Sequence, residues 1–460
     1  MKVNSRENRP DIIKTNQFNN IKGTKSSTIG LVSLGCPKAL VDSERILNRL
    51  SNEGYNITSN YQDAQAVIVN TCGFLNSAKN ESLEAIGEAI DKNGKVIVTG
   101  CLGSTPEFIR ESHPNVMTIT GPQKFNEVLD SITENIPIKS NRFEAKPSPS
   151  YVKLTPKHYS YLKISEGCNH KCSFCIIPSL RGTLKSRSMA SIISEAQSLV
   201  ERGTKELIVI SQDTSAYGLD LKFKEVSVNG KELKTNIYNL VNELASLGAW
   251  VRLHYIYPYP HVRQLIPLMD QNRVLPYLDV PFQHAHPEVL KRMARPSNNV
   301  HDLEQISEWR LINPDLSIRS TFIVGFPGET ESEFNFLLDW LEEAKIDRVG
   351  CFKYEDVSGA RSNMMDGHVQ DDIIEDRYHR FMRKAQEISA LKLKEKVGKT
   401  YTCIIDTVEA DQLLCRTIFD APEIDGLVYI PNSQKKYFAG DRLEVKIKGS
   451  SQYDLKGEIV

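Results

Sequence analysis

The sequence predicts an α/β protein in three folded parts: an open parallel sheet, a partial or full (β/α) barrel and a small antiparallel β-barrel. In residues 28–137, β-rich runs alternate with amphipathic helical stretches, which is typical of a parallel sheet covered by helices. The alternation resumes in residues 150–385 with six β-rich runs and predicts the barrel. Residues 399–460 hold five short β-rich runs separated by turns, typical of an OB-like barrel.

Length and composition agree with a multidomain globular protein. A chain of 460 residues suggests about three domains of ~150 residues each. Its longest apolar runs, such as residues 207–210, are far shorter than the ~18 residues of a membrane span. The formal net charge of −1 gives no general attraction to nucleic acid.

The amino-terminal residues and the cysteine content bear on location. Residues 1–27 are rich in Asn, Lys and Ser, lack the apolar segment of a secretory signal, and are predicted to be a disordered tail. The chain has nine cysteines and no export signal. We therefore predict a cytoplasmic protein in a reducing compartment, where cysteines bind metals more often than they form disulfides.

The first part carries cysteines where three predicted strands end. Strands are expected at residues 28–34, 66–70, 95–99 and 116–120, with helices at 42–52, 76–92, 106–112 and 124–133. Cys36, Cys72 and Cys101 follow the first three strands, and the residues beside them are Gly35, Gly73 and Gly100. The carboxyl ends of parallel strands share one edge, and glycine permits close approach of the backbone to a bulky group. A single such cysteine would be a small packed residue, but three in register favour a cluster site.

A Pro/Ser/Lys-rich linker, residues 137–150, leads to the predicted barrel. Its strands are expected at residues 159–165, 206–211, 250–257, 277–282, 317–324 and 349–354. The main helices are expected at residues 188–202, 238–247, 287–293, 301–311 and 371–396. Asn229-Gly230 predicts a hairpin turn within a surface excursion, residues 219–234.

Three further cysteines lie in the loop after the first barrel strand, at the edge where barrel enzymes place their chemistry. Cys168, Cys172 and Cys175 stand at i, i+4 and i+7. Iron–sulfur clusters take four thiolates, so three would leave one iron open for another ligand. The alternatives are a structural zinc site, with His170 or a distant residue as fourth ligand, or three unrelated buried thiols. Three cysteines within eight residues of a loop favour the cluster.

Other residues at this edge are weaker candidates. Residues 212–214 could supply polar contacts to a ligand, and the glycine turn of residues 325–329 could bring backbone close to one. Arg252, His254 and Gln283 could face the barrel interior. The aromatic run of residues 256–260 has no cluster of Lys or Arg beside it and is predicted to be core.

The C-x3-C-x2-C spacing, with Phe174 before the last cysteine, resembles that of the radical S-adenosylmethionine (SAM) enzymes. The resemblance implies that Cys168, Cys172 and Cys175 hold a 4Fe–4S cluster whose open iron binds SAM. Reductive cleavage of SAM then yields a 5′-deoxyadenosyl radical. It further implies that Gly325 and Gly328 line the SAM pocket.

Two three-cysteine sites in this order resemble the methylthiotransferase branch of those enzymes, which implies a second 4Fe–4S cluster on Cys36, Cys72 and Cys101 and a TRAM domain at residues 399–460. Residues 33–44 look most like members that modify ribosomal protein S-twelve, although Ala39 stands where asparagine is commoner. The implied reaction adds a methylthio group to the β-carbon of an aspartate of that protein, on the small ribosomal subunit. A flavodoxin- or ferredoxin-like electron donor is implied; the sulfur donor is not, and no membrane partner is expected.

Charge in the last part argues against RNA as substrate. Residues 399–460 contain eight Lys and Arg against ten Asp and Glu, a net charge of −2, whereas phosphate binding needs positive charge. The run of residues 420–426 holds three acids and is expected to complement a basic protein. A tRNA adenosine methylthiotransferase is the alternative enzyme. A non-catalytic iron–sulfur or zinc protein that binds ribosomes is the alternative of another class.

Overall fold

The computed structural model describes residues 27–138, 151–270, 274–295, 299–432 and 436–460. The predicted tail and most of the predicted linker lie outside these residues. By its internal contacts the chain forms two units. The first comprises Met1–Thr155 and Ile176–Gly182, and the second comprises Pro156–Cys175 and Thr183–Val460. Each unit is described by itself below.

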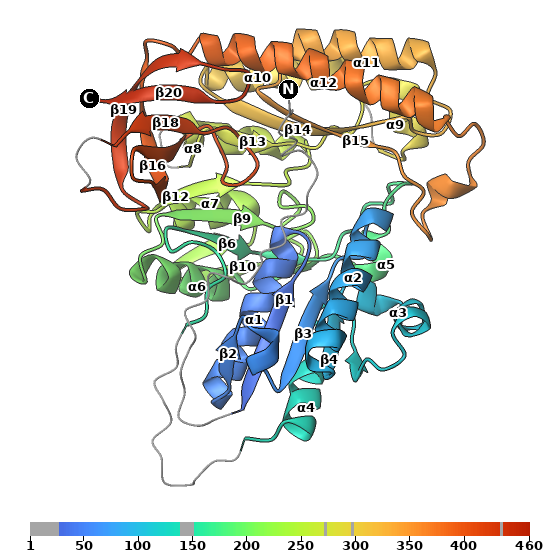
Figure 1. The fold of residues 1–460 in the computed structure, drawn as a ribbon. Coiled ribbons are helices and arrows are strands. Elements are labelled where there is room, and N and C mark those ends of the chain that lie inside the picture. Colours follow the sequence, from blue (N-terminus) through green and yellow to red (C-terminus); the bar gives the residue numbers. More distant parts are fainter. Residues whose placement is uncertain (1–26, 139–150, 271–273, 296–298, 433–435) are drawn as a thin grey trace. The chain divides into compact units, whose positions relative to one another are not determined.

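The first unit is built on a parallel sheet, as predicted, with five strands in the order β2-β1-β3-β4-β5 where four were expected (Figure 1). The strands are β1 (Thr28–Ser33), β2 (Asn56–Thr58), β3 (Ala66–Thr71), β4 (Val96–Gly100) and β5 (Thr118–Ile119). Strands β3 and β4 are buried along their whole length, and their near-continuous apolar sequences suit a sheet covered on both faces. From β1 the chain continues to β2 on one side of the sheet, whereas β3, β4 and β5 follow on the other side. In such sheets, ligands bind at the carboxyl ends of the two strands where the order reverses, here β1 and β3.

Four helices accompany this sheet: α1 (Pro37–Glu53), α2 (Asn76–Asn93), α3 (Pro106–Ser112) and α4 (Phe125–Asn135). Helix α1 begins five residues earlier than predicted, because Pro37 occupies a first-turn position, where proline is well tolerated. Buried Asn70 joins β3 to this helix by donating to the Ala39 carbonyl at 2.8 Å and to Ser43 Oγ at 2.8 Å. The start of α1, which follows Cys36, is therefore tied to the end of β3, which precedes Cys72.

The second unit contains a parallel sheet of six strands in the order β15-β14-β13-β12-β9-β6. The strands are β6 (Tyr159–Lys163), β9 (Glu206–Ile210), β12 (Trp250–Leu253), β13 (Tyr277–Asp279), β14 (Ser317–Val324) and β15 (Arg348–Lys353). Each strand of this sheet pairs with the one before it in the sheet, and among the described residues the sheet does not close. Of the predicted partial or full barrel, the structure is the partial form. The helices are α5 (Ile177–Arg181, grouped with the first unit), α6 (Met189–Glu201), α7 (Ile237–Ala245), α8 (Ile266–Asp270), α9 (Pro287–Arg292), α10 (Asn299–Ile312), α11 (Glu331–Ala344) and α12 (Asp371–Lys394).

The two faces of the barrel strands differ. One face carries residues such as Leu207, Val209 and Val251, which belong to the apolar core shared with the helices. The alternate positions face inward and are mostly polar, and His254 and Arg319 both contact the carboxylate of Asp279 there. The short hairpin β10 (Glu225–Val228) and β11 (Lys231–Lys234) turns at Asn229 and Gly230, whose φ angles are 50° and 77°, as predicted.

The last part forms a closed barrel in the order β16-β17-β18-β20-β19. Its strands are β16 (Thr400–Val408), β17 (Gln412–Thr417), β18 (Val428–Pro431), β19 (Arg442–Ser450) and β20 (Leu455–Ile459). Strands β18 and β20 are parallel, whereas the other pairs are antiparallel as predicted. Closure pairs every strand on both sides and leaves no exposed sheet edge. Among the residues described, no helix is long and apolar enough to cross a membrane.

The closed barrel packs against the amino ends of the partial-barrel strands through buried charges. Arg416 donates to Glu206, the first residue of β9, at 2.8 Å, and both side chains are fully buried. Arg252 donates to Glu206 at 2.7 Å and to the Ile418 carbonyl at 3.1 Å. The carboxyl ends of the strands, which carry Cys168 and its neighbours, are therefore at the end opposite the closed barrel.

The expectation that the acidic run of residues 420–426 forms a docking surface is wrong. Asp420 is buried and paired with Arg348, and Asp425 accepts a hydrogen bond from Tyr277 at 2.8 Å. Glu423 accepts from the hydroxyls of Tyr159 and Tyr161. All three acids therefore bind residues of the partial barrel, and two of them are ion-paired there: Asp420 with Arg348, and Asp425 with Arg319.

Candidate functional site

The first unit brings Cys36, Cys72 and Cys101, the strand-end site, to one edge of its sheet. They follow β1, β3 and β4, which are adjacent strands. The Cys101 amide donates to the Thr71 carbonyl at 3.0 Å, which continues the pairing of β3 with β4 up to the cysteines. The thiols are close enough to influence one another, because charge on Cys36 raises the pKa of both other thiols.

Two glycines let these cysteine turns approach each other. A Cβ atom added to Gly35, whose φ is +96°, would lie 3.1 Å from the Cβ of Cys72 and 3.4 Å from its Sγ. A Cβ added to Gly73 would lie 2.8 Å from the amide nitrogen of Leu102 and 3.0 Å from the carbonyl carbon of Cys101. The glycines beside the cysteines therefore serve the close packing of turn against turn.

The three thiols differ in their electrostatic surroundings. Burial raises the pKa of Cys72 to about 11 and also raises that of Cys101. Surrounding protein disfavours the thiolate of Cys36 as well, but Lys38 and Arg181 more than offset this and lower its pKa. Cys36 also precedes the first turn of α1, where the helix dipole favours negative charge.

The second unit places Cys168, Cys172 and Cys175, the loop site, on the turn after β6 and the short strand β7 (Ser165–Glu166). Gly167, with φ at +76°, starts this turn in a conformation that favours glycine. The amide of His170 donates to Cys168 Sγ at 3.4 Å, and the amide of Cys175 donates to the Cys172 carbonyl at 3.2 Å. Ser173 fastens the loop to the end of α9, since its hydroxyl donates to the Arg292 carbonyl at 2.8 Å.

The other side of the loop is held by a cluster of His170, Asp213 and Tyr259. His170 Nε2 lies 2.8 Å from Asp213 Oδ2, to which the Tyr259 hydroxyl also donates at 2.9 Å. The imidazole of His170 stacks on Tyr257 with ring centroids 4.2 Å apart, and Arg295 lies over the same tyrosine at 4.7 Å. The guanidinium of Arg295 reaches Cys172 Sγ, with Nη1 at 3.7 Å.

The aromatic run of residues 256–260 was predicted to be core, and Ile256 and Tyr257 are indeed buried. The rings of Tyr257 and Tyr259 also contact His170 of the cysteine loop, which was not predicted. The Tyr-Pro-Tyr-Pro run could have suggested this, because its prolines disfavour a regular strand interior. A cavity of about 200 Å³ lies beside the loop, and Cys168, His170, Asp213 and Tyr259 are among its lining residues. Leu219, at the start of the surface excursion, lines the same cavity.

Buried polar groups at this edge include atoms that lack a partner within the described structure. Glu166 accepts from Lys163 Nζ at 2.7 Å and from Gln212 Nε2 at 2.6 Å. Among the residues described, Gln212 Oε1 and Ser165 Oγ are buried with no hydrogen-bond partner. Such atoms are rare in folded proteins and suit a polar ligand that supplies the missing bonds.

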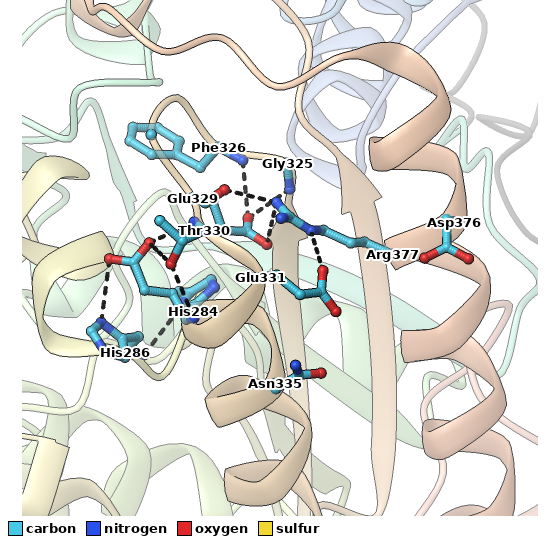
Figure 2. A network of polar contacts seen from close by, with 12 residues as sticks. His284, His286, Gly325, Phe326, Glu329, Thr330, Glu331, Asn335, Asp376 and Arg377 are labelled. Atoms are coloured by element: carbon cyan, nitrogen blue, oxygen red, sulfur yellow. Dashed lines mark hydrogen bonds and ion pairs between the residues drawn. The ribbon is translucent and has the colours of Figure 1, made fainter.

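Gly325 and Gly328 lie at the end of β14, in the turn that leads to α11. Their φ angles are +78° and +76°, and a Cβ on Gly325 would come within 2.4 Å of Ile374 on α12. Figure 2 shows Glu329 folded back on this turn, with Arg377 of α12 reaching it. One carboxylate oxygen of Glu329 accepts from the amides of Gly325 at 2.6 Å and Phe326 at 3.1 Å. The turn is therefore held by its own glutamate and by α12, and a role in binding SAM stays a prediction.

Glu329 combines burial with several hydrogen-bond donors. Arg377 Nη1 lies 3.3 Å from its second carboxylate oxygen. Burial raises the pKa of Glu329 to about 7, although Arg377 and the two amides lower it. His284, which Figure 2 also shows in this network, is fully buried, and its burial and the nearby cations lower its pKa to about 3. Both groups are neutral or partly neutral near pH 7, which limits the charge held beneath the turn.

The donor sets suit iron–sulfur clusters better than zinc. His170 Nε2 is engaged by Asp213 and Tyr259, so this ring nitrogen is not directed to a metal bound by the loop cysteines. Within the described residues, no three His, Cys, Asp or Glu side chains converge on a single metal ion. A cluster needs no such convergence, because each thiolate ligates a different iron. Cys351, Cys403 and Cys415 are buried elsewhere, as predicted.

Comparison with protein-family models divides the chain into three matches. Residues 28–121 match the uncharacterized protein family UPF0004, residues 162–341 match the radical SAM superfamily, and residues 397–460 match the TRAM domain. Among solved structures, the radical S-adenosylmethionine methyltransferase TsrM from Kitasatospora setae is similar, with a TM-score of 0.51 and 14% identity. The match covers 71% of this chain and 75% of that one, and it supports the fold alone.

Curated relatives resemble the chain over its full length. A protein of Roseobacter denitrificans named ribosomal protein uS12 methylthiotransferase RimO is 55% identical over 100% of this chain and 99% of its own. A protein of Paracoccus denitrificans with the same name is 56% identical over 98% of each chain. Three matching domains in the same order, with identity above half of all positions, show common descent. The chain belongs to the ribosomal protein uS12 methylthiotransferase family of radical SAM enzymes.

Proposed function

We propose that this protein is a transferase that adds a methylthio group to the β-carbon of an aspartate in ribosomal protein uS12, in the cytoplasm. The observation that carries the proposal is the pair of three-cysteine sites, one in each unit, in a chain 55% identical to a named uS12 methylthiotransferase over its whole length. The family matches at residues 28–121, 162–341 and 397–460 support our domain boundaries of 28–137, 150–385 and 399–460.

In this proposal, Cys168, Cys172 and Cys175 hold one 4Fe–4S cluster, and Cys36, Cys72 and Cys101 hold a second. When bound, these groups supply reductive cleavage of SAM at the loop site and the transferable sulfur at the strand-end site. Removing hydrogen from an unactivated carbon is beyond side-chain acid–base chemistry, so the cofactors carry that step. The chain's own residues position the cofactors and exclude water.

Specific groups are assigned to these tasks. Asp213 and Tyr259 hold His170 and with it the cysteine loop. The unpartnered Gln212 Oε1 and Ser165 Oγ, beside the carboxylate of Glu166, are available to SAM. Gly325 and Gly328 line the SAM pocket through their backbone. A flavodoxin- or ferredoxin-like protein supplies the electrons.

Substrate entry follows from which end of the partial barrel is covered. Because Arg416, Asp420 and Asp425 close the amino end with buried pairs, the uS12 loop reaches the lumen from the carboxyl end. The closed barrel therefore contributes no acidic docking run at the point of entry. The choice of a protein substrate rests on the relatives and not on charge.

An anaerobic assay of the reconstituted enzyme with SAM and a reductant tests the proposal. It offers uS12, small ribosomal subunits and unmodified tRNA in parallel, and mass spectrometry follows each one. A methylthio mass gain confined to uS12 is expected. A gain on tRNA alone would replace the substrate with the tRNA alternative, and absence of both SAM cleavage and bound iron would favour the non-catalytic alternative.

A further inference from the structure

Arg181 is a buried cation beside the strand-end site. It is the last residue of α5, a short helix that follows Cys175 in the chain but groups with the first unit. Its side chain is only 2% exposed. Its Nε donates to Cys101 Sγ at 3.3 Å, and its Nη1 donates to Asp42 Oδ2 at 3.2 Å.

A guanidinium in such a place needs anionic partners. Burying an unpaired charge is strongly unfavourable, and a neutral thiol is only a weak acceptor. Asp42 offsets the charge of Arg181 but also adds a buried carboxylate close to the thiols, since its charge raises the pKa of Cys101. The arrangement thus places one cation and one anion within reach of the same sulfur.

Lys38 and the amino end of α1 also place positive charge near this site. Cys36 lies at the amino end of the 17-residue helix α1, next to Lys38. Arg181 acts on both Cys36 and Cys101, so its field covers two of the three thiols. Three thiolates around a cluster carry more negative charge than three thiols, and these cations offset it.

We infer that Arg181 is a positioning residue that sets the reduction potential of the cluster at the strand-end site, with Asp42 acting in the opposite direction. Hydrogen bonds to ligating sulfurs and net charge nearby are the protein's means of tuning such clusters. A donor with positive charge stabilises the more reduced, more negative state and raises the potential. A carboxylate stabilises the more oxidised state and lowers it.

Arg181 is close in sequence to the loop-site cysteines, although it contacts a cysteine of the strand-end site. Arg181 stands six residues after Cys175, so the segment directly after the loop-site ligands supplies the cation of the strand-end site. The inference rests on the proposed function only in requiring a cluster on Cys36, Cys72 and Cys101.

The test is a redox titration of that cluster alone. Full-length protein lacking the loop-site ligands (Cys168→Ala, Cys172→Ala and Cys175→Ala) is reconstituted anaerobically, its iron is measured, and its midpoint potential is followed by electron paramagnetic resonance. In this background Arg181→Gln should lower the potential, Arg181→Lys should lower it less, and Asp42→Asn should raise it. Arg49→Gln, on the exposed part of α1, is the matched control and should leave it unchanged.

Opposite shifts of the midpoint potential for Arg181→Gln and Asp42→Asn would support the inference. A loss of packing alone would not make the direction of the shift depend on the charge that was removed. If the Arg181→Gln protein does not bind the cluster, the midpoint potential of Asp42→Asn tests the inference, because that variant retains the arginine. An unchanged or lowered potential in Asp42→Asn, with iron content intact, would overturn the inference and leave the proposed function standing. Absence of iron in the parent background would overturn both.

Discussion

The loop site and the strand-end site hold three cysteines each by different means. At the loop site, the cysteines lie within eight residues, and side chains hold the loop from both sides: His170 through Asp213 and Tyr259, and Ser173 through the end of α9. At the strand-end site, the cysteines span 66 residues of the chain, and the sheet itself holds them. Their turns are fitted together by glycines, because a Cβ on Gly73 would lie 2.8 Å from the Leu102 amide nitrogen and one on Gly35 would lie 3.1 Å from the Cβ of Cys72.

The two sites are therefore sensitive to different substitutions. A loop fastened by side chains can lose one fastening and keep its ligands near one another, because the chain connects them. A site assembled from three strands depends on strand packing, so a backbone disturbance separates its ligands. Each site also has an arginine near one of its sulfurs. At the loop site, Arg295 lies over the ring of Tyr257 and reaches Cys172, and at the strand-end site Arg181 donates to Cys101.

The largest expected effect separates the chemistry of the two sites. Cys172→Ala should abolish SAM cleavage, whereas Cys72→Ala should leave cleavage intact and abolish the methylthio product. The measurements are 5′-deoxyadenosine by chromatography and the mass of uS12. Cys351→Ala removes a buried cysteine outside both sites and should retain both activities. Normal product from Cys72→Ala would contradict the role assigned to the strand-end site.

The next largest effect is on the stability of the second unit, which carries the loop site, when the buried carboxylate of Glu206 is removed. Burial raises the pKa of Glu206, but Arg416 and Arg252 together hold it at about 2. Glu206→Gln takes the carboxylate from buried Arg252, whereas Arg416 keeps its pairing with Asp406 at 2.6 Å. The change should cost about 3–5 kcal/mol of unfolding free energy at pH 7. All three tryptophans, Trp250, Trp309 and Trp340, lie in the second unit, so tryptophan fluorescence in denaturant reports on it alone.

The lowered pKa of Glu206 also predicts that its contribution to stability depends on pH. Because the pKa of Glu206 is lower in the folded protein than in the unfolded chain, its contribution is present above the unfolded value of about 4.5. It is lost as the pH falls from there through about 2. The difference in unfolding free energy between wild type and Glu206→Gln should therefore shrink over that range. A difference independent of pH between 6 and 3 would contradict the assignment.

A smaller effect tests whether backbone packing holds the strand-end site. A Cβ on Gly100, whose φ is +95°, would lie 2.4 Å from Asn70 Oδ1 and 2.5 Å from the Thr71 carbonyl oxygen. Strain and overpacking predict a loss of about 2–4 kcal/mol for Gly100→Ala. Gly94→Ala is the matched control, because Gly94 has a similar φ of +81° with nothing within 4 Å, and should cost about 1 kcal/mol.

Hydrogen exchange at residues 66–71 and 96–100 measures this effect within the first unit. Gly100→Ala should also lower the iron bound to the strand-end site in protein that lacks the loop-site cysteines. Equal losses from Gly100→Ala and Gly94→Ala would show that steric fit at the sheet edge does not hold the site.

The smallest effect tests the side-chain fastening of the loop site. Asp213→Asn keeps the shape but removes the charged acceptor shared by His170 and Tyr259, a loss of about 1–2 kcal/mol. In protein lacking the strand-end cysteines, the cluster should bleach in air roughly tenfold faster, since 1.4 kcal/mol corresponds to about a factor of ten. Asp220→Asn, whose carboxylate binds Ser186, is the control and should not change this rate.

Much of the fold was predictable from local pattern. The helices and strands that frame the strand-end cysteines, the barrel alternation and the Asn229-Gly230 hairpin each depend on residues close in sequence. The three-residue strand β2 was missed, because so short an edge strand has almost no periodicity. The parallel pairing of β18 with β20 was missed as well, because an alternating pattern carries no information about strand direction.

The acidic run shows what a charge count leaves out. Asp420 and Asp425 look like a solvated loop in the sequence, but their partners Arg348 and Tyr277 stand 72 and 148 positions earlier in the chain. The contacts of Tyr257 and Tyr259 with His170 were likewise not predicted, because nothing near these tyrosines in the sequence indicates a residue 87 or more positions away. Burial and partner choice between distant segments are properties of packing.

The order of the amino acids is sufficient to predict the three-part α/β organisation and to single out six cysteines. Short spacing keeps Cys168, Cys172 and Cys175 near one another, and parallel strands align Cys36, Cys72 and Cys101 at one edge. Which charges surround these cysteines depends instead on how distant segments pack. Arg181, Asp42 and Cys101 come from three separate segments, and electrostatic interaction depends on distance in space and on burial, neither of which residue order records.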